Sequence, residues 1–308
     1  MGEVTLSWGL MRSRVRSIAS ASIWGLMVIM GPPLAAQDHR TAILDAERAA
    51  AESSRDSGFA GAILRSIHPS GVLLWPGAPV VAGAVDLKRF LKGSQIDMLQ
   101  LTWQPLGIEV ARDSNLAMTW GVAVVSPSRK APSPEIGNYI TAWRRDGTRW
   151  TIAALVFAGL RQLPKIVTAV ELPASKKALQ ARGSTGPFVA SDLAFARLAA
   201  DSGAAVAFER WAAPDAITFG DGGLLTRGPA AIGRAVDFPA VWRWYPVVAG
   251  AAGTGDLGWT VGEATITGTG KDATTTHSKY LTIWTRRSDG VIRFLIDGGN
   301  GRPVTAGH

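Results

Sequence analysis

Two stretches of the chain carry the same succession of hydrophobic and polar positions. Each opens with apolar residues at helical spacing, which predicts amphipathic helices over residues 41–55 and 190–201. An Asp-Ser-Gly sequence follows each helix, and its glycine favours a helix end because glycine adopts the left-handed conformation at little cost. A short strand, a glycine-rich turn and a further short helix are predicted next, over residues 72–74 and 85–91 in the first stretch and 217–219 and 230–236 in the second.

Four longer segments rich in Val, Thr, Ile and Trp close each stretch, and Asp-Gly, Gly-Thr-Gly and Ser-Pro turns separate them. Helices that precede a run of strands are typical of an α+β fold with the helices on one face of an antiparallel sheet. The sequence therefore predicts two tandem α+β domains.

The motifs recur in order, which indicates an internal duplication. Asp56-Ser57-Gly58 returns 145 residues later at Asp201. Trp103-Gln104-Pro105 and the Tyr139 to Trp143 segment return 141 residues later, so one small deletion aligns the two halves. We expect a first domain over residues 38–159, a connector over 160–187 that is rich in Pro and Gly, and a second domain over 188–303.

The first 36 residues have the layout of a secretory signal peptide. Three arginines precede an apolar run from Ile18 to Met30, and small residues follow up to Ala36. The run is shorter than the ~20 residues of a membrane-spanning helix, so a cleaved leader is favoured and a retained anchor is the alternative. We expect an exported protein, either periplasmic or secreted.

The amino-acid composition excludes several kinds of binding site and partner. The chain has no Cys and four His, so neither a disulfide framework, a thiolate site, a metal site nor another cofactor is predicted. The net charge of +8 falls to +6 without the leader, which holds three Arg and one Glu. The remaining basic residues are scattered in pairs, so nucleic acid is not an expected partner, and no membrane contact is expected after leader removal.

Several motifs of the second stretch resemble one known family. They are Asp192, Asp215, Thr226-Arg227-Gly228, Trp244-Tyr245-Pro246, the segment from Lys279 to Trp284, and the segment from Phe294 to Asp297. In these the chain resembles the nuclear transport factor 2-like superfamily, in particular its SnoaL-like and calcium/calmodulin kinase association-domain branches. The resemblance covers residues 188–300 well and 41–158 more loosely. It implies a curved antiparallel sheet wrapped round N-terminal helices into a cone with an apolar pocket. The superfamily includes isomerases, dehydratases, cyclases, binding modules and assembly domains, so no activity is implied.

The two copies differ at positions that carry ionisable groups. The second has Asp215, Glu263, His277 and Asp297 where the first has Ser70, Val122, Ile136 and Leu155. An ionisable group on an inward face costs several kcal/mol unless it is paired. This contrast places a working site in the second domain and a degenerate one in the first.

Alternation along the strands puts Glu263 on one face with Trp259, and Asp297 on one face with Arg293 and Leu295. If Glu263 and Asp297 meet inside the cone, burial and mutual repulsion would raise a pKa and give a general acid or base. The resemblance implies Asp297 as base and Tyr280 as hydrogen-bond donor. His277 is the remaining candidate, but regular alternation puts it on the face opposite Tyr280. The structural alternative is a solvated Glu263 and an Asp297 paired with Arg293 or Lys279.

Aromatic residues supply the candidates for ligand binding. Trp103, Trp143, Trp244 and Trp284 recur at equivalent places and are interpreted as framework. Trp211, Trp242 and Trp259 have no Trp counterpart in the first copy, and with Tyr245 they are the expected ligand contacts.

Three functions remain open. The first is a module that binds a small apolar molecule in the second domain, and the second is an enzyme of the isomerase, dehydratase or cyclase type. The third is an interaction module in which the two copies pair within one chain as a pseudo-dimer.

Overall fold

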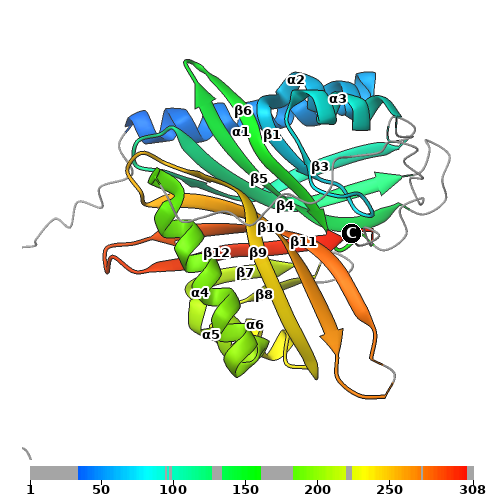
Figure 1. The fold of residues 1–308 in the computed structure, drawn as a ribbon. Coiled ribbons are helices and arrows are strands. Elements are labelled where there is room, and N and C mark those ends of the chain that lie inside the picture. The colour runs from blue at the N-terminus through cyan, green and yellow to red at the C-terminus, as the bar shows by residue number, and fades with distance from the viewer. Residues whose placement is uncertain are drawn as a thin grey trace, which may run out of the picture. The chain divides into compact units, whose positions relative to one another are not determined.

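The structure is a computed structural model, and it describes residues 34–93, 96, 99–126, 134–160, 183–219, 224–271 and 273–303. Within these residues the chain forms two six-stranded sheets, each with its own helices (Figure 1). Most of the predicted leader and of the predicted connector lies outside the described residues. None of the helices in the described part of the chain is both long and apolar enough to cross a membrane.

The first domain begins with the helices α1 (Leu34–Ser57) and α2 (Phe59–Ser66). The strands β1 (Ile67–Leu74) and β2 (Val81–Ala82) and the helix α3 (Ala84–Gly93) follow. Four long strands complete it: β3 (Gln100–Val110), β4 (Leu116–Ser126), β5 (Glu135–Asp146) and β6 (Arg149–Ala158). Their order in the sheet is β2-β1-β6-β5-β4-β3.

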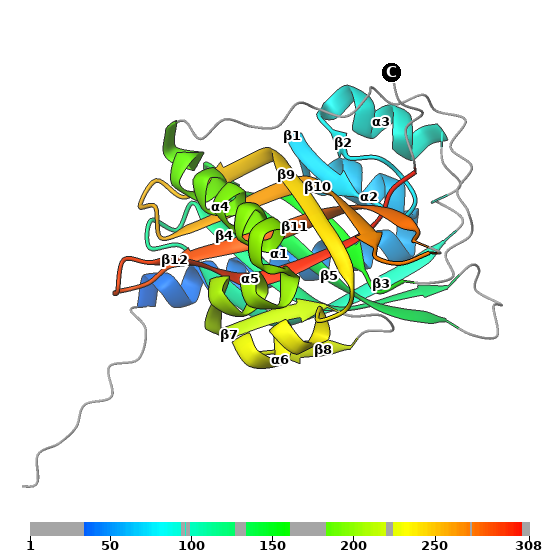
Figure 2. The same cartoon turned by 60° about the horizontal axis from the view of Figure 1, so that its bottom comes forward.

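The second domain repeats this plan. After a short 3-10 turn (Gly183–Thr185) it has α4 (Gly186–Ser202), α5 (Ala204–Trp211), β7 (Ala212–Phe219), β8 (Leu225–Arg227) and α6 (Pro229–Ala235). Its long strands are β9 (Ala240–Ala251), β10 (Leu257–Gly268), β11 (Thr275–Arg286) and β12 (Ile292–Gly301), in the sheet order β8-β7-β12-β11-β10-β9. Helix α4 packs on β9 and β10, and Figure 2 shows it lying across this sheet. The α+β class and the tandem arrangement are confirmed.

The sheets are mixed, whereas the sequence predicted purely antiparallel ones. β1 runs parallel to β6, and β7 runs parallel to β12, while the four long strands of each domain pair antiparallel. Each long strand pairs antiparallel with the next long strand along the chain. The first strand instead joins the sheet beside the last, so no hairpin constrains its direction.

The two Asp-Ser-Gly sequences end their helices as predicted, although both glycines have a ψ of 155° and so do not adopt the predicted left-handed helical conformation. Gly58 and Gly203 have φ angles of 83° and 89°, and the next helix starts directly after each of them. A side chain at either position would strain the backbone, because L-residues rarely adopt a positive φ. Glycine therefore sets the sharp angle between the first two helices of each domain.

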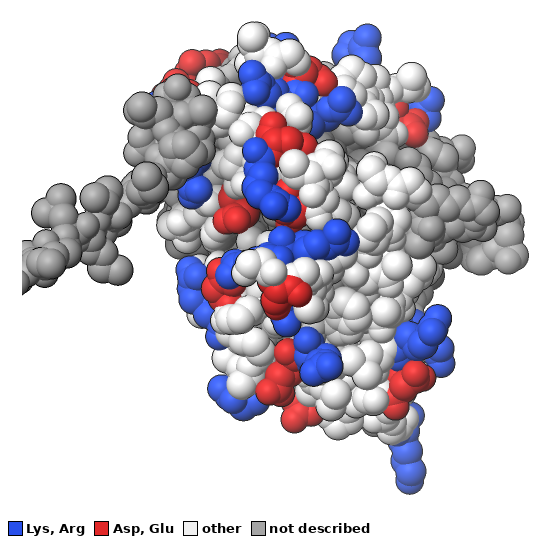
Figure 3. Space-filling model, turned by 90° about the vertical axis from the view of Figure 1, so that its left-hand side faces the viewer, with Lys and Arg blue, Asp and Glu red and all other residues white. Residues whose placement is uncertain are grey.

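The described halves are in contact. One buried apolar cluster contains Ile140 and Ala154 of the first sheet together with Val261 and Leu281 of the second. Polar contacts add to it, since the Asn300 side-chain amide donates to the carbonyl oxygens of Leu74 (2.9 Å) and Phe157 (2.7 Å). Across one face of the molecule, Lys and Arg side chains lie interspersed with Asp and Glu (Figure 3).

Candidate functional site

A cavity of about 480 Å³ lies in the second domain, between its helices and one face of its sheet. Seven of its 22 lining residues are aromatic, and the others include several hydroxyl-bearing residues, Lys279 and Asp297. Those that matter below are Phe208, Phe238, Trp242, Tyr280, Thr282 and Asp297.

The cavity exists because large side chains of the first copy are small in the second. Phe157 pairs with Tyr139 in the first sheet, and the equivalent partner of Tyr280 is Gly299. Likewise Phe90 of α3, which is fully buried, corresponds to Ala235 of α6. Gly299 and Ala235 both line the cavity. Sequence reasoning missed these positions because it compared the copies for charge, whereas a comparison of side-chain volumes would have found them.

Asp297 is the carboxyl group of the cavity, whose lining residues also include Lys279 and Tyr280. Burial raises the pKa of its carboxyl from 3.8 to about 7, and the nearby Asp192 adds to the rise. The Thr282 hydroxyl, 2.5 Å from Asp297 Oδ2, donates to it and acts in the opposite direction. A carboxyl group with a pKa near neutrality is suited to exchange a proton or to donate a hydrogen bond at neutral pH.

Tyr280 also borders the cavity, but its hydroxyl is directed to a different carboxylate. It donates to Asp192 Oδ2 at 2.9 Å, and Trp244 Nε1 donates to Asp192 Oδ1 at the same distance. Asp192 is fully buried, and burial raises its pKa to about 6. The hydroxyl proton of Tyr280 is therefore engaged by α4 and does not point at Asp297.

The first domain contains a matching arrangement. Glu47 of α1 takes the place of Asp192, and burial raises its pKa to about 7 against the opposing effects of Tyr139 and Thr119. The Trp143 indole donates to Thr119 at 2.8 Å, and the Trp284 indole donates to Thr260 at 2.8 Å. Because this hydrogen-bond network recurs in both copies, we interpret it as stabilising the fold. Sequence analysis noted Asp192 only as part of a resemblance, although the matched acidic positions of the first helices were a signal for the pair.

Glu263 does not meet Asp297. Its neighbour Ala264 lines the cavity, so by alternation Glu263 lies on the opposite face of β10. There it is 3% exposed, accepts a hydrogen bond from the Tyr245 hydroxyl (3.2 Å) and lies 3.4 Å from Arg302 Nη2. The expectation that these two carboxylates share the cone is wrong, and so is the solvated alternative for Glu263.

Asp297 also departs from the expected pattern of its strand. A bulge at Leu295 pairs Phe294 with Trp284 and Asp297 with Thr282, so Phe294 and Asp297 face the same side. Regular alternation along β12 would have grouped Asp297 with Arg293, which instead donates to Asp289. The bulge adds one residue and reverses the phase of the strand.

His277 lies between Thr276 and Ser278, which both line the cavity, so its side chain is on the opposite face of β11 from Tyr280. Of the four aromatic candidates, Trp242 lines the cavity. Trp211 packs against Phe195 and Trp284, Tyr245 contacts Glu263, and Trp259 lines a separate pocket between the two sheets.

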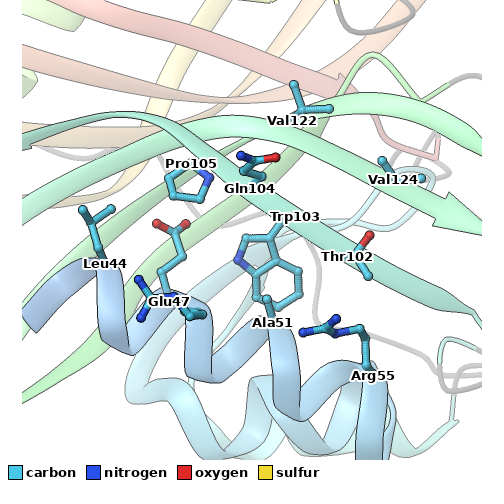
Figure 4. A pocket seen from close by; sticks show the side chains of 11 residues that line it. Leu44, Glu47, Ala51, Arg55, Thr102, Trp103, Gln104, Pro105, Val122 and Val124 are labelled. Atoms are coloured by element: carbon cyan, nitrogen blue, oxygen red, sulfur yellow. The ribbon is translucent and has the colours of Figure 1, made fainter. Parts of the chain in front are cut away.

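The first domain has a pocket of its own at a different place. A groove of about 590 Å³ runs between α1 and the edge strand β3, and Glu47, Arg55 and Trp103 line it. Figure 4 shows the side chains of Glu47 and Arg55 rising from α1 toward β3. Since Glu47 already accepts a hydrogen bond from Thr119 (3.1 Å), its main contact is with the sheet. In the described residues, no group of three or more His, Asp and Glu is placed to hold a metal ion.

Neither a protein-family model nor a curated protein matches this chain. Among solved structures, it is similar to a Xanthomonas campestris protein provisionally assigned as a calcium/calmodulin-dependent protein kinase II association domain. The identity is 16%, the match covers 44% of this chain and 100% of that one, and the TM-score is 0.37. It is also similar to a ketosteroid isomerase-like protein of Erwinia carotovora, with 16% identity and a TM-score of 0.31. That match covers 38% of this chain and 92% of the other. A third similar structure is an NTF2-like protein of Novosphingobium aromaticivorans with a cystatin-like fold. The identity is 15%, the match covers 40% of this chain and 83% of that one, and the TM-score is 0.34.

Each of these three matches covers roughly two fifths of the chain.

Proposed function

We propose that the second domain binds a small, largely apolar molecule in its cavity, with one polar group of that molecule directed to Asp297. The observation that carries the proposal is the paired loss of volume at Ala235 and Gly299, where the first copy has buried phenylalanines. The first copy fills this space with side chains, whereas in the second copy it opens to the surface beside Ala235 and Phe238, which are both exposed. The volume of about 480 Å³ falls in the range of small-molecule sites.

The chemistry of the walls indicates the class of ligand. Trp242, Phe208 and Phe238 offer flat apolar surfaces, and a ligand between them would be held by burial of its own apolar area. A protonated Asp297 can donate a hydrogen bond to a carbonyl or hydroxyl oxygen. The favoured ligand is therefore a neutral ring system with one oxygen substituent.

The test is native mass spectrometry of the purified protein, followed by organic extraction of whatever it releases. Ala235→Phe restores the phenylalanine of the first copy and is expected to abolish retention of the ligand. Ala230→Phe places the same side chain on the same helix at an exposed position that does not line the cavity, and it should leave retention unchanged. If wild type carries no small molecule and a panel of polycyclic ketones and phenols gives no mass shift, the proposal fails.

An isomerase or cyclase function is the second candidate, and the pKa of Asp297 is the observation that favours it. In that case Asp297 would take a proton from, or give one to, a carbon next to the oxygen substituent of the ligand. Asp297→Asn should keep the ligand and lose turnover, whereas simple binding predicts that bound molecules are recovered unchanged from both proteins.

We also propose that the chain is exported and that its leader is removed near Ala36, as the basic and apolar pattern of the first 36 residues predicts. The mass of the protein from the exported fraction tests this, because a retained leader would add the mass of those residues.

A further inference from the structure

The groove between α1 and β3 follows one face of the helix. Leu44, Glu47, Ala51 and Arg55 line it, and their spacing of three or four residues places them in one row along α1. Leu44 and Arg55 are 11 positions apart, which corresponds to about 16 Å along a helix. The groove of about 590 Å³ is therefore elongated.

The opposite wall of the groove is the edge strand β3. The Ser54 hydroxyl donates to the carbonyl oxygen of Leu101 (3.1 Å), and the Arg40 guanidinium donates to that of Ile108 (2.9 Å). These contacts hold the helix to the two ends of the strand. Trp103 lines the groove between them.

The strand itself is poorly suited to pair with a further strand. Pro105 has no backbone N–H, and the pairing of β3 with β4 is irregular between Pro105 and Gly107. Proline and such irregularities protect the edge of a sheet from strand addition. A small molecule is therefore a better occupant of the groove than an extended protein segment.

The two copies use the tryptophan beside their first helix differently. In the second copy, Trp244 Nε1 donates to Asp192 at 2.9 Å. Trp103 and Glu47 stand at the equivalent positions, but Glu47 accepts from Thr119 at 3.1 Å. Figure 4 shows the Trp103 ring directed from β3 toward α1. Within the described residues its indole N–H has no acceptor, so it can donate to a ligand in the groove.

Arg55 places a positive charge at one end of the groove. It is exposed, and it forms no hydrogen bond or ion pair within the part of the chain that the structure describes. Arg48, the other arginine of the lining, is paired with Asp45 at 2.8 Å. The second copy has Leu193 and Ala200 at the positions of the two arginines, so this charge belongs to the first copy.

Glu47 does not cancel the charge of Arg55 at mildly acidic pH. Among the described residues that line the groove, it supplies the one carboxyl group. Burial raises the pKa of Glu47 to about 7, so at pH 6 its carboxyl group is protonated in most molecules. An anion beside Arg55 therefore meets little repulsion from Glu47 at that pH.

We propose that the groove binds a linear amphiphile with one carboxylate, such as a medium-chain fatty acid. Its head group pairs with Arg55, and its alkyl chain lies along Ala51 and Trp103 toward Leu44. A planar guanidinium binds a carboxylate through two parallel hydrogen bonds. The elongated groove favours a flexible chain, whereas the cavity of the second domain favours a ring system. The two sites are separate, and the groove does not depend on what the cavity holds.

The test is a titration of the full chain with octanoate at pH 6, followed through the indole N–H signals of a nitrogen–proton NMR spectrum. The signal of Trp103 is the one that Trp103→Phe lacks. We expect this signal to shift saturably, with a Kd of about 1 mM or below. Arg55→Gln should raise the Kd by about three- to tenfold, because a charged pair at an exposed site is lost. 1-Octanol, the uncharged control, should bind more weakly than octanoate by a similar factor.

The matched control is Arg197→Gln, which removes an exposed arginine from the first helix of the second domain. It should change the Kd of octanoate by less than about twofold. Ala235→Phe fills the other cavity and should leave the shift of the Trp103 signal unchanged. Failure of this proposal is therefore distinguishable from failure of the function proposed for the second domain.

The proposal is overturned if octanoate does not shift the Trp103 signal, if 1-octanol binds as tightly as octanoate, or if Arg55→Gln binds octanoate as wild type does. It is also overturned if Arg197→Gln weakens binding as much as Arg55→Gln does. A shift of the Trp103 signal by an acidic peptide and not by octanoate would assign the groove to a protein segment and would likewise refute the proposal.

Discussion

The pKa of Asp297 predicts that Asp297→Asn stabilises the protein at neutral pH. In the folded chain the pKa is about 7, against 3.8 for the free side chain. Between these values the folded state holds a proton that the unfolded state has released, so stability falls as pH rises. The slope for one such group is about 1.4 kcal/mol per pH unit, and the full interval amounts to about 4 kcal/mol.

Asparagine is neutral at every pH and does not titrate in this range. We therefore expect wild type and Asp297→Asn to be similarly stable near pH 4, and the variant to be more stable by up to about 4 kcal/mol above pH 7. Asp192 and Glu47, with pKa values of about 6 and about 7, keep part of the pH dependence in the variant. The slope should fall but not to zero, because Asp192, Glu47 and Glu109, whose pKa values burial also raises, still contribute to it.

The assay is urea unfolding, followed by circular dichroism, at intervals between pH 4 and pH 8. Asp256→Asn is the control, because its effect on stability is expected to change with pH in the opposite direction. Although burial acts to raise the pKa of Asp256, hydrogen bonds from Thr254 and the Arg112 amide outweigh it and the net pKa is lowered. Its ionised form therefore contributes stability above the unfolded pKa, and this contribution is lost as pH falls.

Parallel stability curves for wild type and Asp297→Asn between pH 5 and pH 7 would refute the reasoning. Such curves would mean that Asp297 is ionised in the folded protein. An ionised Asp297 could not donate the hydrogen bond to a ligand oxygen that we propose for it.

Two further substitutions test the contacts that hold the domains and the network together. Asn300→Ala leaves the carbonyl oxygens of Leu74 and Phe157 without their amide donor. We expect it to lower the free energy of unfolding, measured in urea, by about 1–3 kcal/mol. An unchanged urea midpoint of unfolding would show that water replaces the amide. Trp244→Phe removes the indole donor of Asp192 and should raise the pKa of the Asp192 carboxyl, which NMR titration can measure. A lower pKa would contradict the hydrogen bond from Trp244 to Asp192.

The amino-acid sequence determined the architecture. The recurrence of Asp-Ser-Gly fixed where the first helices end, because only glycine adopts the positive φ of Gly58 and Gly203 without strain. The ordered matches at constant spacing predicted two copies of one α+β domain, and the charge contrast at Leu155 and Asp297 pointed to the second copy. Trp242, which the sequence predicted as a ligand contact, lines the cavity.

Tertiary structure decided which face of each strand looks into the cavity. Alternation relates residues of one strand to one another, but it does not say which side is covered by helices and which by the other sheet. Glu263 therefore looked equivalent to Asp297, although β10 turns it to the side where Tyr245 and Arg302 contact it. The bulge at Leu295 shifted the phase of β12, and no local signal marks such an insertion because the pairing strand specifies it. The pocket between the sheets depends on residues far apart in sequence, and only the docking of one sheet on the other brings Trp259 and Leu116 together.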